Sequence, residues 1–436
     1  MSHTFHPVSW SINVSIYEVN LRQYTQEGSF DAFRPHLKRL AEMGIDVLWF
    51  MPITPISHKN RKGSLGSYYA SSSYRTINPE FGSLEEWKTI VSEAHAMGMK
   101  VIMDWVANHT GCDHEWTQSH PDFYKRDHNG QFYDSHGWDD VIDLNYENPE
   151  MRQEMISCMQ QWLVETDIDG FRCDMAMLTP VDFWEQARTA LEKSKPLFWL
   201  AELDPLDHPE YMRVFDAAYT WRWMNEASRF MNEGSHHVHA LRQVLDLYMH
   251  SLPSTACPAW FTSNHDENSW NGTEYEKYGP MALPLAVFSA TWKGLTLIYS
   301  GQEIPNQKRL LFFDKDPLEW KDDPELHEFY KKILKLRKRN SALCCLSDQG
   351  NCHHIWNSVD HHVFSFVRSS NEDKLFVLIN FSIWDLPEIE IDTMDLEGEY
   401  IELFSEDNVL MDGDRKLFSL PAWGYKIYIK KKADHG

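Results

Sequence analysis

The segment Asp169-Gly170-Phe171-Arg172-Cys173-Asp174 places a cation and a carboxylate two residues apart. Apolar and polar residues alternate through it as in a short β-strand, so the side chains of Arg172 and Asp174 leave the same face. A neighbouring guanidinium keeps a carboxylate ionised at neutral pH and fixes its orientation. An ionised Asp at the end of a barrel strand is the nucleophile that a retaining glycosidase requires. An ordinary buried Arg–Asp ion pair has the same spacing, so the rest of the chain must decide.

Segments of alternating strand and helix character position this pair. Continuous apolar runs such as 46–51 (DVLWFM) are typical of strands buried on both faces. Ser83 and Glu86 form a capping-box pattern that begins a helix, and short links between such elements indicate a parallel sheet. The predicted helices are 30–43, 83–97, 149–166, 180–192 and 324–339. The predicted strands, which match the number in a (β/α)8 barrel, are 15–20, 46–51, 100–106, 168–174, 196–201, 214–219, 259–263 and 295–299.

Two regions depart from this alternation. Residues 110–141 are rich in His, Asp, Trp and Tyr and have no clear period, which predicts a small lobe inserted after the third strand. Beyond residue 340, segments that alternate with period two are separated by Asn, Asp and Gly turns, which predicts an antiparallel β-sandwich. The predicted fold is α/β: a (β/α)8 TIM barrel (1–109 and 142–340), the lobe (110–141) and a C-terminal β-sandwich (341–436).

Catalytic side chains of such barrels lie at the carboxyl ends of the strands. The chemically capable residues that follow the third, fourth, fifth and seventh predicted strands are Asp104, His109, Arg172, Asp174, Glu202, His265 and Asp266. Each could have a structural role, but their joint occurrence at one barrel mouth predicts an active site. The apolar residues 199–201 before Glu202 are expected to raise the pKa of that carboxyl, whereas Arg172 keeps Asp174 ionised. Two carboxyls in different protonation states suit a double displacement.

Four of these stretches resemble the α-amylase family of retaining, α-glucan-active barrels. They are 104–109 (DWVANH), 170–174 (GFRCD), the region of Glu202, and 264–266 (NHD), and they occur in the family's order. The resemblance covers roughly residues 12 to 430. It implies that Asp174 is the nucleophile, that Glu202 is the general acid/base, and that Asp266 is the third carboxylate, which binds hydroxyls of the reacting sugar.

The resemblance also implies a set of sugar-binding residues. Tyr69 would stack under the reacting sugar, His109 and His265 would bind its hydroxyls, Arg172 would hold Asp174 ionised, and Asp104 would support the site from below. Taken alone, His109 reads as a loop histidine and Tyr69 as packing, since its neighbour in the chain is also a tyrosine. Of the carboxylates, Asp104 has the strongest case for a purely structural role.

These residues predict a retaining glycoside hydrolase that cleaves α-glucosidic bonds in starch-like glucans or maltooligosaccharides. An α-glucosidase or a glucosyltransferase of the same family would carry the same residues. A non-catalytic sugar-binding or scaffold protein on this barrel would be marked by loss of a carboxylate, and all three are present.

Composition limits the classes of binding partner and the cellular compartment that we expect. The 436-residue chain has a formal net charge of −24, which disfavours nucleic acid and anionic membranes but not a neutral polymer. We find no apolar run long enough to span a membrane and no signal peptide, so we expect a cytoplasmic protein, or a secreted or periplasmic one if a leader has been removed. The seven cysteines are scattered, and Cys344, Cys345 and Cys352 lack obvious partners, which favours a reducing compartment.

Many α-amylases hold a structural calcium, and Asn108 matches one of its ligand positions. Residues 22–31 lack the oxygen-ligand spacing of a metal loop, the lobe is short, and 175–178 (MAML) lacks the Lys-His pair common after the nucleophile. We therefore predict no metal-binding residues and no required cofactor; a structural calcium stays open but is disfavoured. The histidines interpreted as solvated residues of the lobe are His114, His120, His128 and His136.

Overall fold

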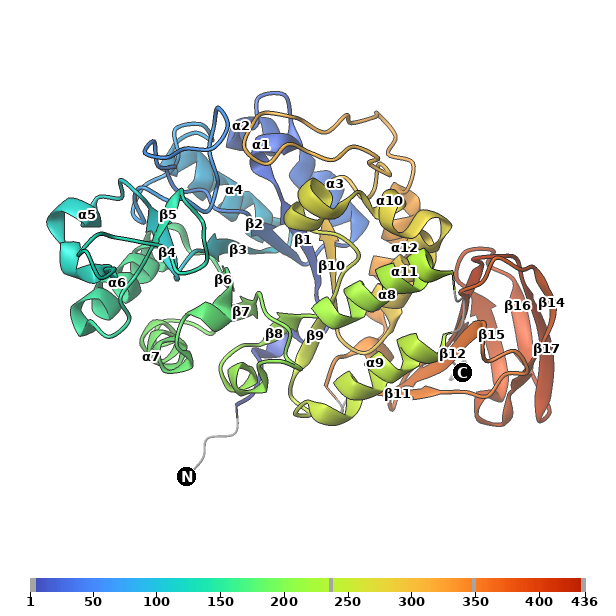
Figure 1. Ribbon diagram of the computed structural model, residues 1–436. Coiled ribbons are helices and arrows are strands. Elements are labelled where there is room, and N and C mark those ends of the chain that lie inside the picture. Colours follow the sequence, from blue (N-terminus) through green and yellow to red (C-terminus); the bar gives the residue numbers. More distant parts are fainter. Residues whose placement is uncertain (1–4, 235–237, 347–349, 433–436) are drawn as a thin grey trace.

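The structure is a computed structural model that describes residues 5–234, 238–346 and 350–432. Eight parallel strands close into a barrel in the order β1-β10-β9-β8-β7-β6-β3-β2 (Figure 1). The strands are β1 (Ser15–Val19), β2 (Val47–Phe50), β3 (Lys100–Trp105), β6 (Gly170–Cys173), β7 (Phe198–Ala201), β8 (Ala217–Tyr219), β9 (Cys257–Trp260) and β10 (Leu295–Tyr299). Apart from Lys100 at the start of β3, every residue in them is buried, which is why the sequence shows continuous apolar runs. The predicted TIM barrel is confirmed.

Helices surround the barrel (Figure 1). They are α1 (Leu21–Tyr24), α2 (Phe30–Phe33), α3 (His36–Met43), α4 (Leu84–Ala96), α6 (Pro149–Thr166), α7 (Val181–Leu191), α8 (Trp221–Glu233), α9 (His239–Ser251), α10 (Glu274–Tyr278), α11 (Ala282–Thr291) and α12 (His327–Arg339). The predicted capping box of α4 is present, with Ser83 and Glu86 bonded reciprocally. The prediction of one helix over 30–43 is wrong, because Pro35 has no N–H to continue the hydrogen-bond ladder of α2.

The lobe after β3 is built on a two-stranded antiparallel sheet of β4 (His109–Gly111) and β5 (Val141–Asp143), with α5 (Trp116–Ser119) beyond it. The interpretation of His114 as a solvated residue is wrong. It is fully buried against the rings of Tyr74 and Trp116, and its Nδ1 accepts a hydrogen bond from the Trp116 N–H. The other three histidines predicted to be solvated, His120, His128 and His136, are exposed.

The C-terminal region is the predicted antiparallel sandwich. Its strands are β11 (Asn351–His354), β12 (Val363–Ser369), β13 (Lys374–Asn380), β14 (Leu386–Asp392), β15 (Gly398–Glu402), β16 (Asn408–Met411), β17 (Arg415–Leu420) and β18 (Tyr425–Lys430). Six of them form a sheet in the order β11-β12-β13-β18-β15-β16, and β14 pairs with β17. Phe376 and Tyr428 of the large sheet share one core with Ile389 and Phe418 of the small one. The sequence analysis missed β11, β14, β16 and β17.

Two cysteines far apart in the sequence meet at the base of the barrel. Cys257 of β9 and Cys345 form a disulfide with a Cα–Cα distance of 5.8 Å and a sequence separation of 88 residues. The interpretation that Cys345 has no partner is therefore wrong, because only the closed fold brings its partner close. Within the described part of the chain, no helix combines the length and the apolar character needed to cross a membrane.

Candidate active site

Arg172 lies fully buried beneath the barrel mouth, among carboxylates from three neighbouring strand ends. Its Nη1 lies 2.8 Å from Asp104 Oδ1 and 3.0 Å from Asp174 Oδ1. Its Nη2 lies 2.8 Å from Glu202 Oε2. The ring of Trp49 covers the guanidinium carbon at 4.8 Å from the ring centroid. One cation therefore joins the carboxylates that follow or end β3, β6 and β7, and the parallel pairing of those strands sets this geometry.

Burial raises the pKa of both candidate catalytic carboxyls. The pKa of Asp174 rises to about 6, because burial outweighs the opposing effect of Arg172. The pKa of Glu202 rises to about 7, because burial again outweighs Arg172 and the negative charge of Asp174 adds to the rise. Arg172 contacts Asp174 as expected, and its guanidinium fork also contacts Glu202, which the sequence did not predict. Glu202 nevertheless holds its proton more readily than Asp174 does.

The turn after β6 holds the Glu202 carboxyl from above. Met175 has a left-handed backbone with φ 38°, which is uncommon for a residue other than glycine. In this conformation its N–H donates to Glu202 Oε2 at 2.8 Å. The next N–H, of Ala176, donates to the Glu202 carbonyl at 3.1 Å. A main-chain donor cannot be read from residue type, so this contact could not be predicted.

On the opposite side of the mouth, a buried imidazole links three other side chains. His265 Nδ1 lies 2.5 Å from Glu18 Oε1, and its Nε2 lies 2.7 Å from the Tyr69 hydroxyl and 3.3 Å from Asp266 Oδ2. Burial opposes protonation, but Asp266 and Glu18 raise the pKa of His265 well above its ordinary value. The imidazolium in turn overcomes the effect of burial on Asp266 and leaves its pKa below the ordinary value. Asp266 is thus held ionised.

Sequence reasoning missed Glu18, although the signal was available. Glu18 is the one charged residue in β1, whose residues are all buried. A carboxylate inside a strand buried on both faces requires a partner, and His265 is that partner. The sequence also left Tyr68 and Tyr69 unresolved. The Tyr68 hydroxyl donates to Asn20 Oδ1 at 2.9 Å, whereas the Tyr69 hydroxyl donates to Asp104 Oδ2 at 3.1 Å.

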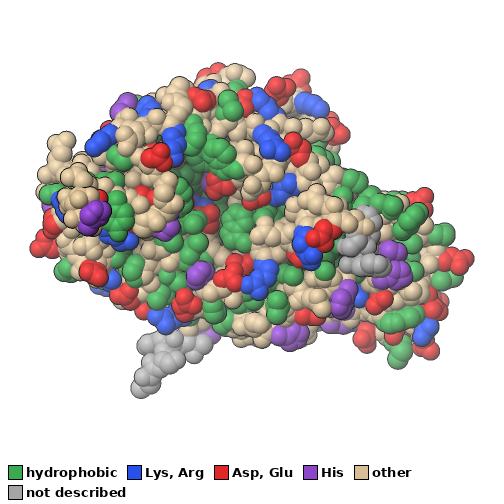
Figure 2. Space-filling view, in the orientation of Figure 1, with side chains coloured by type: hydrophobic (Ala, Val, Ile, Leu, Met, Phe, Trp, Pro, Cys, Tyr) green, Lys and Arg blue, Asp and Glu red, His purple; other side chains and the backbone are tan. Residues whose placement is uncertain are grey.

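A cavity of about 410 Å³ lies over these groups. Figure 2 shows this face hollowed between the lobe and the barrel, with acidic and hydrophobic side chains around the hollow. The predicted residues that line the cavity are Tyr69, His109, Asp174, Glu202 and Asp266. The other three, Asp104, Arg172 and His265, are buried behind its wall and contact the lining residues. The structure therefore brings all eight predicted residues together.

His109 is the lobe's contribution from the predicted set. Burial lowers the pKa of His109 to about 4, so its imidazole is neutral near pH 7 and can both donate and accept a hydrogen bond. Its ring lies 5.5 Å from that of Trp138. The lining residues that the sequence did not predict are Lys62, Ser67, Trp138, Asp140, Val141, Met175, Trp270, Phe312 and Phe313. Most of them stand on loops, whose sequence carries no period to reveal them.

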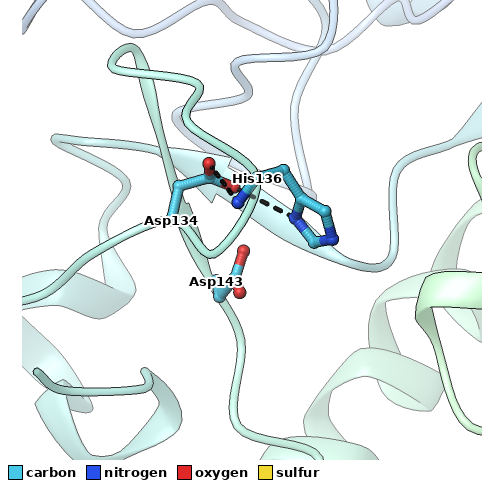
Figure 3. Close-up of side chains that lie close together, drawn as sticks. All are labelled: Asp134, His136 and Asp143. Carbon is cyan, nitrogen blue, oxygen red and sulfur yellow. Dashed lines mark hydrogen bonds and ion pairs between the residues drawn. The ribbon is translucent and has the colours of Figure 1, made fainter.

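One group of side chains in the described residues has the spacing of a metal site. Asp134, His136 and Asp143 each offer a ligand atom, and these atoms lie within 4.8 Å of one another (Figure 3). However, Lys125 Nζ already lies 3.2 Å from Asp143 Oδ2, and the Ser135 hydroxyl donates to the same oxygen at 2.5 Å. Calcium prefers about six to eight oxygen ligands, whereas this set includes an imidazole nitrogen and a neutralised carboxylate. These residues do not fit calcium.

Asn108, which matches a calcium-ligand position by resemblance, contacts the neighbouring residue His109 through its side chain. Its side-chain Nδ2 lies 3.2 Å from His109 Nδ1, and its main-chain carbonyl accepts from the Leu144 N–H. The side chain therefore orients an imidazole of the cavity wall. The absence of a required metal stays a prediction.

A closed (β/α)8 barrel with an arginine-linked Asp and Glu at its strand ends is the structure of a barrel glycoside hydrolase. The model of the alpha amylase catalytic domain matches residues 22–128 and 122–316, and that of the alpha amylase C-terminal all-beta domain matches 356–430. The chain belongs to the α-amylase family.

Individual relatives and structures agree with this assignment. The chain is 25% identical over 439 residues to a cyclomaltodextrinase of Geobacillus thermopakistaniensis, which covers 92% of the chain and 70% of that protein. It is 23% identical to the α-amylase MalA of Haloarcula japonica, of which it spans only 56%. A maltogenic α-amylase of Thermotoga neapolitana superimposes with a TM-score of 0.87 at 28% identity, covering 97% of this chain and 99% of that one. An α-amylase of Lactobacillus plantarum gives 0.84 at 26% identity, covering 96% and 99%.

Proposed function

We propose that this protein hydrolyses α-glucosidic bonds in starch-like glucans or maltooligosaccharides by a retaining double displacement. The observation that carries the proposal is the contact of one buried guanidinium, Arg172, with both Asp174 and Glu202 at the wall of one cavity. A neutral substrate suits a chain of net charge −24. The same charge disfavours nucleic acid or an anionic membrane as partner.

In the first step, Glu202 gives its proton to the glycosidic oxygen while an Asp174 oxygen attacks the anomeric carbon. The carbon–oxygen bond to the leaving sugar breaks, and a glycosyl ester forms on Asp174. In the second step, Glu202, now a carboxylate, removes a proton from water, which attacks the same carbon and releases the sugar and the Asp174 carboxylate. The raised pKa of Glu202, about 7, suits a group that must first hold and then regain a proton.

The remaining residues bind and orient the reacting sugar. We infer that Asp266, ionised beside protonated His265, accepts hydrogen bonds from sugar hydroxyls. Tyr69 presents its ring to the cavity and neutral His109 binds a further hydroxyl. Because Asp174 and Glu202 contact Arg172, Asp266 contacts His265 and Asp143 contacts Lys125, we also propose that the reaction needs no metal.

The test is incubation of the protein with maltoheptaose, soluble starch, isomaltose and trehalose, followed by chromatography of the products. We expect cleavage of maltoheptaose and starch and retention of the α-configuration in the new reducing ends, read by NMR at early times. Action on isomaltose alone, or products of longer chain than the substrate, would favour an α-glucosidase or a glucosyltransferase of the same family instead. A lack of activity on all four sugars contradicts the proposal.

A further inference from the structure

A loop after β2 crosses one side of the cavity and is fixed at both ends. This bridging loop, residues 57–66, meets the lobe through Lys62, whose Nζ lies 2.9 Å from Asp140 Oδ1. The Asn60 side chain donates to the Asp139 carbonyl at 2.9 Å. The main-chain N–H groups of residues 58 and 59 donate to one oxygen of Asp113, also in the lobe.

The other end of the bridging loop is joined to the segment that follows β10. The Leu65 N–H donates to the Phe313 carbonyl at 3.0 Å, and Ser64 donates to Asp314 Oδ1 through both its N–H and its hydroxyl. Gly63 allows this close approach. It has φ +60°, and a Cβ there would lie 2.5 Å from Phe313 Cβ and 2.8 Å from the Phe313 carbonyl oxygen. The loop and this segment therefore form a continuous wall. At residue 63 this wall has no room for a side chain larger than that of glycine.

The barrel order gives the wall its place relative to the chemistry. Going round the barrel, β10, β1, β2 and β3 are consecutive, and the wall is built from the loops that follow β10, β2 and β3. Glu202 follows β7, on the opposite half of the barrel. An acid that protonates the leaving oxygen stands on the reducing-end side of the bond that breaks. A glucan bound with its breaking bond beside Glu202 would therefore extend its non-reducing end toward the wall.

Residues of the wall share the cavity with the reacting groups. Lys62, Asp140 and Phe313 line the same space as Asp174 and Glu202. Asp140 is buried, with 7% of its side chain exposed, whereas the Lys62 side chain is 36% exposed. The cavity volume, about 410 Å³, lies in the lower part of the range of roughly 300 to 1,000 Å³ that holds small ligands. A long glucan that continues past the reacting sugar on this side meets the Lys62–Asp140 ion pair.

We propose that the bridging loop closes the non-reducing end of the cleft, so that the enzyme removes glucose or maltose from chain ends and does not cut glucans internally. Lys62 and Asp140 are then specificity-determining residues: they end the binding site and present a charged pair to the terminal sugar's hydroxyls. This inference rests on the proposed function, since it concerns how the same site admits its substrate.

A matched pair of substrates tests the inference on the unaltered protein. Maltoheptaose has a free non-reducing end, and the same oligosaccharide with that end closed as a 4,6-O-ethylidene acetal does not. We expect glucose or maltose together with the shortened chain as the first products of the free form, and at least a hundredfold slower cleavage of the blocked form and of cyclomaltoheptaose. Equal rates on free and blocked chains, or early release of mixed internal fragments, overturn the proposal. Failure to cleave any of the three overturns the proposed function instead.

Substitutions of wall residues test the proposal by the same comparison of free and blocked substrates. Lys62→Ala and Asp140→Ala remove either member of the ion pair and shorten the side chain that ends the cavity. We expect the blocked-to-free rate ratio to rise at least tenfold in Lys62→Ala, with a circular dichroism spectrum like that of the parent. Lys59→Ala is the matched control, because Lys59 is on the same loop but lines a different cavity and should leave the ratio unchanged. If Lys59→Ala and Lys62→Ala change the ratio equally, loop integrity rather than the ion pair is responsible, and the assignment of Lys62 is wrong.

Discussion

Two clusters of the molecule are made of the same parts, carboxylates around one cation, and behave in opposite ways. At the barrel mouth Arg172 is fully buried and the pKa values of Asp174 and Glu202 rise to about 6 and about 7, with burial as the main cause. In the lobe, burial also acts on Asp143, but hydrogen bonds from Ser135 and the charge of Lys125 outweigh it and lower the pKa. Lys125 is 40% exposed.

The number of charges that share a cation explains the difference. Arg172 contacts Asp104, Asp174 and Glu202, so each negative charge also repels the others in a site of low polarity. In the lobe, Lys125 and a hydroxyl serve one oxygen of Asp143. The first arrangement leaves a proton available for transfer near neutral pH, which is what general acid catalysis needs, and the second fixes a charge for structural support.

The largest expected effect comes from removing the proposed nucleophile. Asp174→Asn keeps the size and most hydrogen bonds of the side chain but removes the attacking anion, so turnover should fall by about three orders of magnitude or more. Oligosaccharide affinity, measured by isothermal titration calorimetry, and the circular dichroism spectrum should stay close to those of the parent. Retained turnover in Asp174→Asn would end the interpretation of the barrel cluster as catalytic.

The second prediction separates acid catalysis from nucleophilic attack. Glu202→Gln should reduce hydrolysis of maltooligosaccharides by about two to four orders of magnitude, since their leaving groups need a proton. It should reduce the first step for 4-nitrophenyl glycosides much less, and added azide should restore turnover of those substrates because azide needs no general base. Equal loss on both substrate classes, with no effect of azide, assigns the acid/base role to another residue.

The third prediction is a pH profile. Catalysis needs Asp174 ionised and Glu202 protonated, so kcat/KM should be bell-shaped, with limbs near the pKa values of about 6 and about 7. On an aryl glycoside with a good leaving group, Glu202→Gln should lose the alkaline limb and keep the acid one. An unchanged alkaline limb in that variant identifies a different acid. Asp143→Asn should leave both limbs of the kcat/KM profile unchanged, because residue 143 lies in the lobe.

The same two clusters show which features of the fold and the site could be predicted from the sequence. The eight strands and their order followed from apolar runs and cap signals, because burial on both faces leaves that pattern in the residue types. The polar residues at strand ends were found because they stand at the ends of these apolar runs. The sharing of Arg172 between Asp174 and Glu202 could not be found, since it depends on the stagger of neighbouring strands. The bridging loop left no pattern, because its contacts run through main-chain groups and one glycine.

The fourth prediction concerns stability and should have opposite signs in the two clusters. The folded-state pKa of Glu202 is raised, so its contribution to stability is present below its unfolded pKa and lost as pH rises through about 7. Glu202→Gln should therefore stabilise the protein at pH 8 by about 1 to 3 kcal/mol and have little effect at pH 4. Thermal unfolding at the two pH values measures this difference.

The matched change in the lobe should go the other way. The pKa of Asp143 is lowered, so its contribution is present above the unfolded pKa, ordinarily about 4, and is lost as pH falls through the folded value. Asp143→Asn should lower stability at pH 7 by about 1 to 2 kcal/mol, the usual worth of a charged hydrogen bond, and the deficit should shrink at pH 3. Shifts of the same sign in both variants contradict the comparison.

The smallest expected effect is that of chelation. Lys125 already supplies the positive charge beside Asp143, so EDTA should leave turnover and Tm within error of the untreated protein. Lys125→Met removes that charge while Asp134, His136 and Asp143 remain close together, and it should lower Tm modestly. Added calcium should then recover more Tm in Lys125→Met than in the parent, because only the variant has two uncompensated carboxylates to offer. If calcium instead raises the Tm of the parent by several degrees, the lobe binds a metal alongside Lys125. The two clusters then differ by an ion and not by how their charges are shared.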